Sequence, residues 1–190
     1  MAAVSNFQPR YSSNSGSTWN NIGAGSSWYF QSDLAADRVR LDFTCTPSKS
    51  CKITEISVIC PIARDSGTGS SSAEFTANLY VGNSPEGTPI ATVTRTETIN
   101  QSYNGFTFVF DISKVAAITD ETEFCVTLFA NVRCRLAGTN FGAAASADEA
   151  SMGAARIGDE LYQCYIKDGE SVGLYLPYIK IGEELVLYGG

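Results

Sequence analysis

The chain of 190 residues contains no histidine. Histidine is the commonest general base and metal ligand in proteins, and it completes the Ser–His and Cys–His nucleophile pairs. The sequence also lacks a G-x-x-x-x-G-K-[ST] phosphate loop and a strand-following G-x-G-x-x-G motif. We therefore predict a protein that is not an enzyme and that has no cofactor, no catalytic residue and no metal ligand.

The 20 aspartates and glutamates leave one route to catalysis, a facing pair of carboxylates as in glycoside hydrolysis. Acidic clusters fall at 120–123, 148–149, 158–160 and 182–184, always among turn-forming residues. Carboxylates ordinarily support turns at such places, so a carboxylate-dependent glycosidase is the less favoured hypothesis. Calcium held by these loops stays open, although no D-x-[DN]-x-[DN]-G spacing occurs.

Positive charge is scarce, with 13 lysines and arginines and a net charge of −7. Arg38 and Arg40, like Arg133 and Arg135, are two residues apart, so each pair shares one face of a strand. We expect solvated strand faces there. Nucleic-acid-binding proteins usually carry a basic stripe, and a bilayer span needs roughly 20 apolar residues. The sequence shows neither feature, so we predict no nucleic-acid partner and no membrane partner.

The N-terminal segment lacks the basic region and apolar core of a secretory signal, so we expect synthesis in a cytoplasm. Cytosolic thiols stay reduced, and a free cysteine behaves as a small buried hydrophobe. We therefore predict six free thiols, mostly in or near the core: Cys45, Cys51, Cys60, Cys125, Cys134 and Cys164. A disulfide between Cys45 and Cys51 is the alternative, and it needs Cα atoms within about 7 Å.

Short runs of alternating apolar and polar residues recur along the chain. Phe106, Phe108 and Phe110 share one side of the run 106–112, the pattern of a half-buried strand. The run 124–132 is apolar on both faces, as in a central strand. Further strand-like runs occupy 38–45, 51–62, 75–81, 90–99, 160–167, 172–181 and 185–190. This spacing predicts an all-β fold, an antiparallel β-sandwich of about eight or nine strands.

Two segments do not show this pattern. Residues 1–27 are rich in Ser, Asn and Gly, and we predict an extended N-terminal arm there, ahead of a single sandwich domain at 28–190. The arm is either flexible or docked on a neighbouring subunit. Residues 137–156 are rich in Ala and Gly, and we expect a surface loop or a short helix near 147–156. The candidate docking residues of the arm are Phe7, Tyr11, Trp19 and Ile22.

The block 39–131 resembles a jelly-roll-like accessory domain of phage virion proteins and bacterial surface proteins. The resemblance rests on the strand runs "KITEISVIC", "FTANLYV" and "FTFVFDI", on the loop Ser84–Pro89, and on the turn Thr119–Phe124. It covers about half of the chain, and its motifs are structural rather than catalytic. It implies a jelly-roll-like sandwich and a role in display or attachment.

The resemblance and the expected cytoplasmic synthesis lead to a hypothesis about function. We expect a non-enzymatic virion structural protein of a phage, either a capsid decoration or a tail or fibre component, assembled in the host cytoplasm. Its partners would be other virion proteins and copies of itself. The alternative is a glycan-binding module for host or surface attachment, in which exposed aromatic rings stack on sugar faces. The candidate rings are Trp28, Tyr29, Tyr103, Tyr175 and Tyr178.

Overall fold

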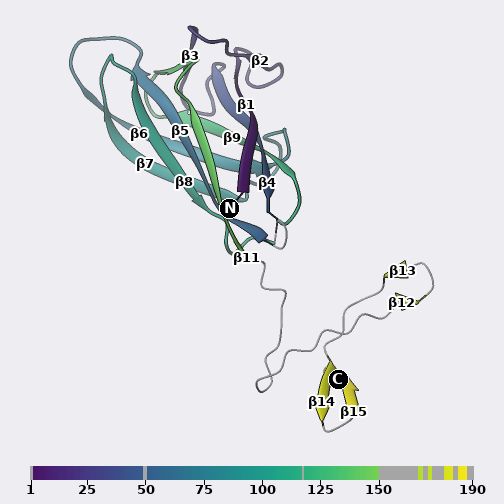
Figure 1. The fold of residues 1–190 in the computed structure, drawn as a ribbon. Coiled ribbons are helices and arrows are strands. Elements are labelled where there is room, and N and C mark those ends of the chain that lie inside the picture. Colours follow the sequence, from purple (N-terminus) through teal and green to yellow (C-terminus); the bar gives the residue numbers. More distant parts are fainter. Residues whose placement is uncertain are drawn as a thin grey trace. The chain divides into compact units, whose positions relative to one another are not determined.

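Every element in the described part of the chain is a β-strand. The computed structural model describes residues 2–48, 51–116 and 118–149, together with short strands at 167–168, 171–172, 178–181 and 184–187. No helix occurs within these ranges, and all the strand pairings are antiparallel (Figure 1). The predicted antiparallel all-β class is therefore confirmed.

The chain divides into two compact units, Met1–Ala150 and Ser151–Gly190, where we predicted one domain at 28–190. In the second unit, β12 (Lys167–Asp168) pairs with β13 (Ser171–Val172), and β14 (Tyr178–Ile181) pairs with β15 (Glu184–Leu187). These pieces cover only parts of the three strands predicted there. Cys164 and Tyr175 lie outside the described residues.

The first unit holds eleven strands in one hydrogen-bonded sheet. They are β1 (Ala2–Ser12), β2 (Asn20–Asn21), β3 (Ser27–Phe30), β4 (Arg38–Pro47), β5 (Cys51–Arg64), β6 (Ser71–Val81), β7 (Ala91–Ile99), β8 (Asn104–Asp111), β9 (Thr122–Ala130), β10 (Cys134–Ala137) and β11 (Gly142–Glu149). Six of the predicted strand runs lie in this unit. The five strands that were not predicted are β2, β3 and β10, which are too short to show an alternating pattern, and β1 and β11, whose sequences lack it.

The sheet folds into two layers. One layer has the order β1–β4–β9–β6–β7, and in the other β5 pairs with β8 on one side and with β10 and β11 on the other. A single residue pair, Ala2 with Ala145, links β1 to β11 and joins the layers. The ends β7 and β8 do not pair, so the sheet is not closed. The chain crosses between layers after β2, β3, β4, β5, β7, β8 and β9, in keeping with the predicted jelly-roll-like sandwich.

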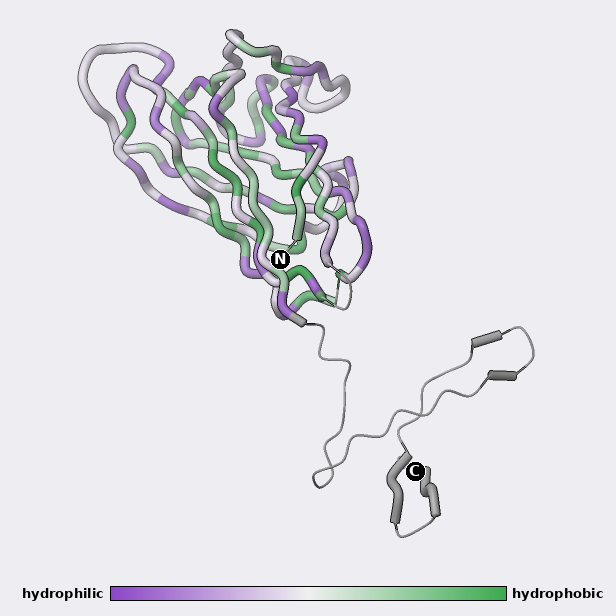
Figure 2. The backbone as a smooth tube through the Cα atoms, viewed as in Figure 1, coloured by the Kyte–Doolittle hydropathy of each residue, from purple (hydrophilic) through white to green (hydrophobic). Residues whose placement is uncertain are grey.

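Phenylalanine rings fill the space between the layers. Phe75 of β6 contacts Phe106 and Phe108 of β8, with ring centroids 5.9 and 6.2 Å apart. Phe43 stacks on Phe124 between the neighbouring strands β4 and β9, at 5.9 Å. Figure 2 shows hydrophobic stretches along the strands of this unit. The predicted inward face of the run 106–112 is thereby confirmed, since all three of its phenylalanines are buried.

The predicted N-terminal arm needs a correction, because residues 2–12 form strand β1 inside the sheet. β1 runs antiparallel to β4, from Ala2 opposite Pro47 to Ser12 opposite Arg38. A bulge between Ser5 and Gln8 shifts the register, and Asn6 there has a φ of 55°. A bulge breaks the two-residue alternation, so this strand lacks the sequence pattern by which the others were predicted.

The alanine- and glycine-rich segment also needs a correction. Residues 142–149 are neither loop nor helix but strand β11, which lies between β5 and β1. A Cβ added at Gly142 would lie 3.3 Å from Cδ1 of Ile59, so a small residue allows the close approach. Ala143 and Ala145 pack against the core. Alanine and glycine have low strand propensity, and here tertiary packing overrides it.

The predicted turn between β6 and β7 is confirmed as a closed loop. Gly82 and Gly87 both have a φ of 89°, a conformation that favours glycine. The Ile90 N–H donates to the Leu79 carbonyl at 2.8 Å and closes the loop. Pro85, between the two glycines, has no amide to donate, so β6 does not run on into this loop.

Five cysteines lie in the described residues, and all five are free thiols. Cys45, Cys60, Cys125 and Cys134 are buried, as predicted, whereas Cys51 is only half-buried. Cys45 and Cys51 therefore do not pair. Desolvation raises the pKa of Cys45, Cys125 and Cys134 to about 12 and also raises the pKa of Cys60.

We predict that Cys51 alone reacts quickly with iodoacetamide in the folded protein carrying Cys164→Ser. The thiolate is the nucleophile, and burial both shields the other four thiols and raises their pKa. Mass spectrometry should find one alkyl group before unfolding and five after unfolding without reductant. Adding Cys51→Ser should remove the fast reaction. Rapid alkylation of several thiols, or fewer than five after unfolding, would contradict the structure.

Candidate functional site

The predicted docking residues Phe7 and Ile22 contact their own subunit. The Phe7 ring lies 6.0 Å from the Phe43 ring and 5.6 Å from the Phe141 ring, measured between centroids. Ile22 is buried in the core, and its N–H donates to the Pro9 carbonyl at 2.9 Å. Both side chains therefore fasten the N-terminal segment to the sandwich.

The other two docking candidates, Tyr11 and Trp19, also contact their own subunit. Tyr11 stacks on Trp28, a predicted glycan residue, with ring centroids 3.7 Å apart. Trp19 lies over the Arg40 guanidinium at 4.7 Å. The structure therefore brings Tyr11 and Trp28 together. Because the two rings stack on each other, each has one face less to offer a partner subunit or a sugar.

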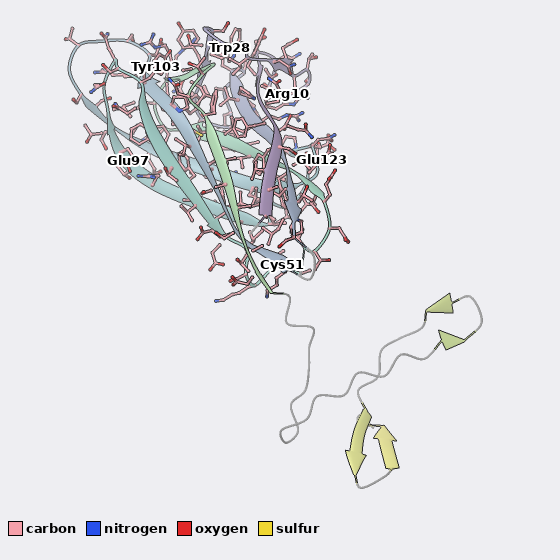
Figure 3. All side chains as sticks on the ribbon, in the orientation of Figure 1. Arg10, Trp28, Cys51, Glu97, Tyr103 and Glu123 are labelled. Atoms are coloured by element: carbon pink, nitrogen blue, oxygen red, sulfur yellow. The ribbon has the colours of Figure 1, made fainter. Side chains whose placement is uncertain are left out.

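Two further glycan candidates lie beside arginines. Tyr29 stacks with Arg133 at 4.6 Å and Tyr103 with Arg135 at 5.4 Å, each measured from the guanidinium carbon to the ring centroid. Trp28 and Tyr103 lie toward the same end of the first unit, far from Cys51 (Figure 3). Tyr178 lies in β14, where the structure describes only the backbone. Tyr175 is outside the described residues, as noted above.

A cluster of three charged side chains, two of them buried, lies on the outer side of β4 and β1. Asp42 is 2.7 Å from Nε of Arg10 and 3.2 Å from Nε of Arg40. Arg40 and Asp42 are only 6% and 8% exposed, which corrects the expectation of a solvated face at Arg40. The atoms are close, but neither contact is an in-line hydrogen bond. Desolvation raises the pKa of Asp42, although both guanidinium groups act to lower it.

A polar depression of about 290 Å³ lies on the outer side of β6 and β9, beside the chain that follows β3. Glu74, Thr76 and Asn78 alternate along β6, so all three face outward. Phe129 of β9 lies opposite Thr76 and is half-buried. The full lining is Ser32, Asp33, Glu74, Thr76, Asn78, Phe129, Ala130 and Asn131.

Two side-chain amides that line this depression accept hydrogen bonds through their oxygens. Asn131 Oδ1 accepts from the Glu74 N–H at 2.9 Å, and the Asn131 N–H donates to the Glu74 carbonyl at 3.0 Å. Asn78 Oδ1 accepts from the Thr92 hydroxyl at 2.8 Å. These bonds fix the orientation of both side chains and leave each Nδ2 as the available donor.

The segment that completes the depression is fastened to the sandwich. The Ala130 N–H donates to the Gln31 carbonyl at 3.2 Å. The Arg38 guanidinium donates to the carbonyls of Asp33 and Ala35. Sequence reasoning did not find this site, because Asp33 and Phe129 are far apart in the chain. Phe129 also lies in a run that predicts a strand buried on both faces.

The outer face of the other layer carries no charged side chain at its centre. It consists of Ser57 and Ile59 of β5, Thr107 and Val109 of β8, and Gly142 and Ala144 of β11, and we call it the flat face. Ile59 is 41% and Val109 is 45% exposed. Glu55 pairs with Asp111 at one end, and Arg135 pairs with Ala63 at the other.

Comparison with known proteins gives no family assignment. The chain matches no protein-family model, and a search of curated proteins finds no match to it. In the described part of the chain, no three acidic or cysteine side chains gather closely enough to hold a metal ion. The same residues contain no helix of the length and apolarity needed to cross a membrane.

We predict that the stability of the wild type falls relative to that of Asp42→Asn as the pH rises. Burial raises the pKa of Asp42 above its ordinary value of 3.8, so the folded state holds this proton more tightly than the unfolded chain. The resulting stabilisation is present below pH 3.8 and is lost as the pH passes through the folded pKa. Urea denaturation across this window measures the difference.

Asp111→Asn is the control with the opposite sign. Hydrogen bonds from the Ser113 hydroxyl and N–H lower the pKa of Asp111, so the wild type should gain stability over this variant as the pH rises toward 3.8. Exchanging the protonated Asp42 side chain for an amide beside Arg10 and Arg40 adds an offset that does not change with pH, because arginine stays charged throughout. A difference for Asp42→Asn that is constant or grows with pH would contradict the assignment.

Proposed function

We propose that the protein is a non-enzymatic structural component that self-associates through the flat face. The observation that supports this proposal is the exposure of Ile59 and Val109 at the centre of an uncharged three-strand surface. Small neighbours, Gly142 and Ala144, let a second surface approach the backbone closely. Exposed apolar surface of this kind is typical of protein–protein contacts.

Charge favours a second copy of the chain as the occupant of this face. Two copies with a net charge of −7 repel each other, so close contact is easiest where the surface is uncharged. The flat face has acidic residues, Glu55 and Asp111, at one end and Arg135 at the other. A two-fold axis that lies in the interface and runs across the strands would place the acidic end of each copy opposite the basic end of its partner.

The jelly-roll-like resemblance extends this proposal to a phage virion. The sandwich-like fold and the Ser84–Pro89 loop between β6 and β7 support the resemblance. On this basis the protein is a capsid decoration or a tail or fibre component, assembled in the host cytoplasm with other virion proteins and with copies of itself.

The virion assignment predicts that the protein is present in purified particles of the phage that encodes it. Quantitative mass spectrometry of gradient-purified particles should find it at a fixed ratio to the major capsid protein, because a structural component has a defined copy number. Antibody labelling in electron micrographs then distinguishes head from tail. Presence only in the lysate and not in the particles would contradict the virion role.

Val109→Arg is predicted to abolish self-association by placing a charge at the centre of the flat face. Analytical ultracentrifugation should show an oligomer for the wild type and a monomer for the variant. Val81→Arg is the matched control, because Val81 is 51% exposed and belongs to β6 in the other layer. Thermal unfolding verifies that both variants fold. A monomeric wild type, or equal association of all three proteins, would contradict this interface.

Glycan binding through the predicted aromatic residues receives less support. Trp28 is stacked on Tyr11, and Tyr29 and Tyr103 lie against arginine side chains. Rings engaged in this way present less free surface to a sugar. The polar depression beside Phe129 presents amides and carboxylates that are better suited to a sugar.

A further inference from the structure

We propose that the polar depression beside Phe129 is a binding site for a neutral carbohydrate. It combines an aromatic side chain, two oriented amides and two carboxylates around one open volume of about 290 Å³. That volume is near the lower limit of roughly 300 Å³ for ligand pockets and suits one or two sugar rings rather than a larger ligand. The proposal does not depend on self-association, which uses the other layer.

The apolar part of the site is supplied by Phe129 and Ala130. Phe129 is half-buried, so its ring is anchored in the sheet and still contributes surface to the depression. Sugar rings have one face of C–H groups that pack on aromatic surfaces, and an amphipathic ligand of this kind fits a wall of mixed polarity.

The polar part of the site matches the hydroxyl groups of a sugar. Nδ2 of Asn78 and Nδ2 of Asn131 are donors, since each amide oxygen is already engaged by a protein group. The carboxylates of Asp33 and Glu74 are acceptors. A sugar hydroxyl both donates and accepts, and its hydrogen bond to a carboxylate is stronger than one between neutral groups.

Charge at the site selects against acidic sugars. Asp33 and Glu74 line the depression, and its lining residues include no lysine or arginine. A uronic or sialic acid would bring its carboxylate beside these two groups in a protein that already has a net charge of −7. We therefore assign neutral hexoses and N-acetylhexosamines as the ligand class.

The site is largely formed before a ligand binds. Gln31, Asp33 and Ala35 are held by hydrogen bonds to the backbone of β9 or the side chain of Arg38. Glu74, Thr76 and Asn78 lie on a strand paired on both sides. A pre-organised site loses little conformational entropy on binding, which improves affinity for a small ligand.

A polar surface continues from the depression onto β7. Thr92 bonds to Asn78, and Thr94 lies 3.5 Å from Thr76 between their hydroxyl oxygens. Two more threonines, Thr96 and Thr98, continue the exposed face of β7. A longer glycan can therefore extend from the depression along this row of hydroxyls.

The test uses the full chain on an array of neutral oligosaccharides of glucose, galactose, mannose and N-acetylglucosamine, with uronate- and sialate-containing glycans alongside. Isothermal titration calorimetry then measures affinity for the neutral glycan that gives the strongest signal. We expect Glu74→Gln and Phe129→Ala each to weaken binding at least about tenfold, as losing a charged hydrogen bond or a stacking surface does. Glu86→Gln, in the loop after β6, is the matched control and should bind as the wild type does.

The outcomes separate this proposal from the others. Neutral-glycan binding that both variants weaken and Glu86→Gln preserves would support the site, and Val109→Arg should retain it even as a monomer. No neutral glycan bound, equal binding by Glu74→Gln and the wild type, or a preference for acidic glycans would overturn it. Phe129→Ala alters packing and could prevent folding. In that case the affinity of Glu74→Gln alone tests the site. Cleavage of the bound glycan, followed by mass spectrometry, would support the site and overturn the non-enzymatic function.

Discussion

The contact of Phe75 with Phe106 and Phe108 holds the two layers of the sandwich together. The ends of the sheet, β7 and β8, share no backbone pairing. Apolar packing therefore holds these two strands near each other, whereas backbone hydrogen bonds hold the other neighbouring strands. Arg95 of β7 assists at this edge, since its guanidinium donates to the Thr107 carbonyl of β8. Because the phenylalanines occupy the inner faces, both outer faces remain available for other chemistry.

These outer faces have opposite characters, and the proposed roles follow from that difference. The flat face has small and apolar residues at its centre, which suits contact with an identical surface. The outer side of β6 and β9 has carboxylates, amides and one aromatic ring around a depression, which suits a small polar ligand. On the proposed roles, placing the two surfaces on different layers would let one molecule associate with copies of itself and present its ligand sites at the same time. Such an arrangement would increase the avidity for a multivalent glycan.

Packing holds the N-terminal segment to the sandwich, and a cluster of charges fixes its register. Asp42 lies between Arg10 of β1 and Arg40 of β4, and Trp19 covers the Arg40 guanidinium. Burying charges is costly, and removing one partner of such a cluster is more costly still. The cluster therefore favours a single register of β1 on β4 despite the bulge. A segment that looks like a polar arm in the sequence thus becomes an integral strand.

The sequence by itself determined the antiparallel all-β class, the inward face of β8, the loop between β6 and β7, and the burial of four cysteines. Each of these depends on signals that are local in the sequence, such as the alternation of apolar residues or the presence of turn residues. Tertiary structure decided the rest. Strand β1 has a bulge that hides its alternation, and β11 consists of weak strand formers that pack closely beside Ile59. The depression joins Asp33 to Phe129, which the folded chain brings together and which the hydrogen bond from the Ala130 N–H to the Gln31 carbonyl helps to hold in place. Long-range pairing of this kind leaves no periodic signal in the chain, so only the folded molecule shows it.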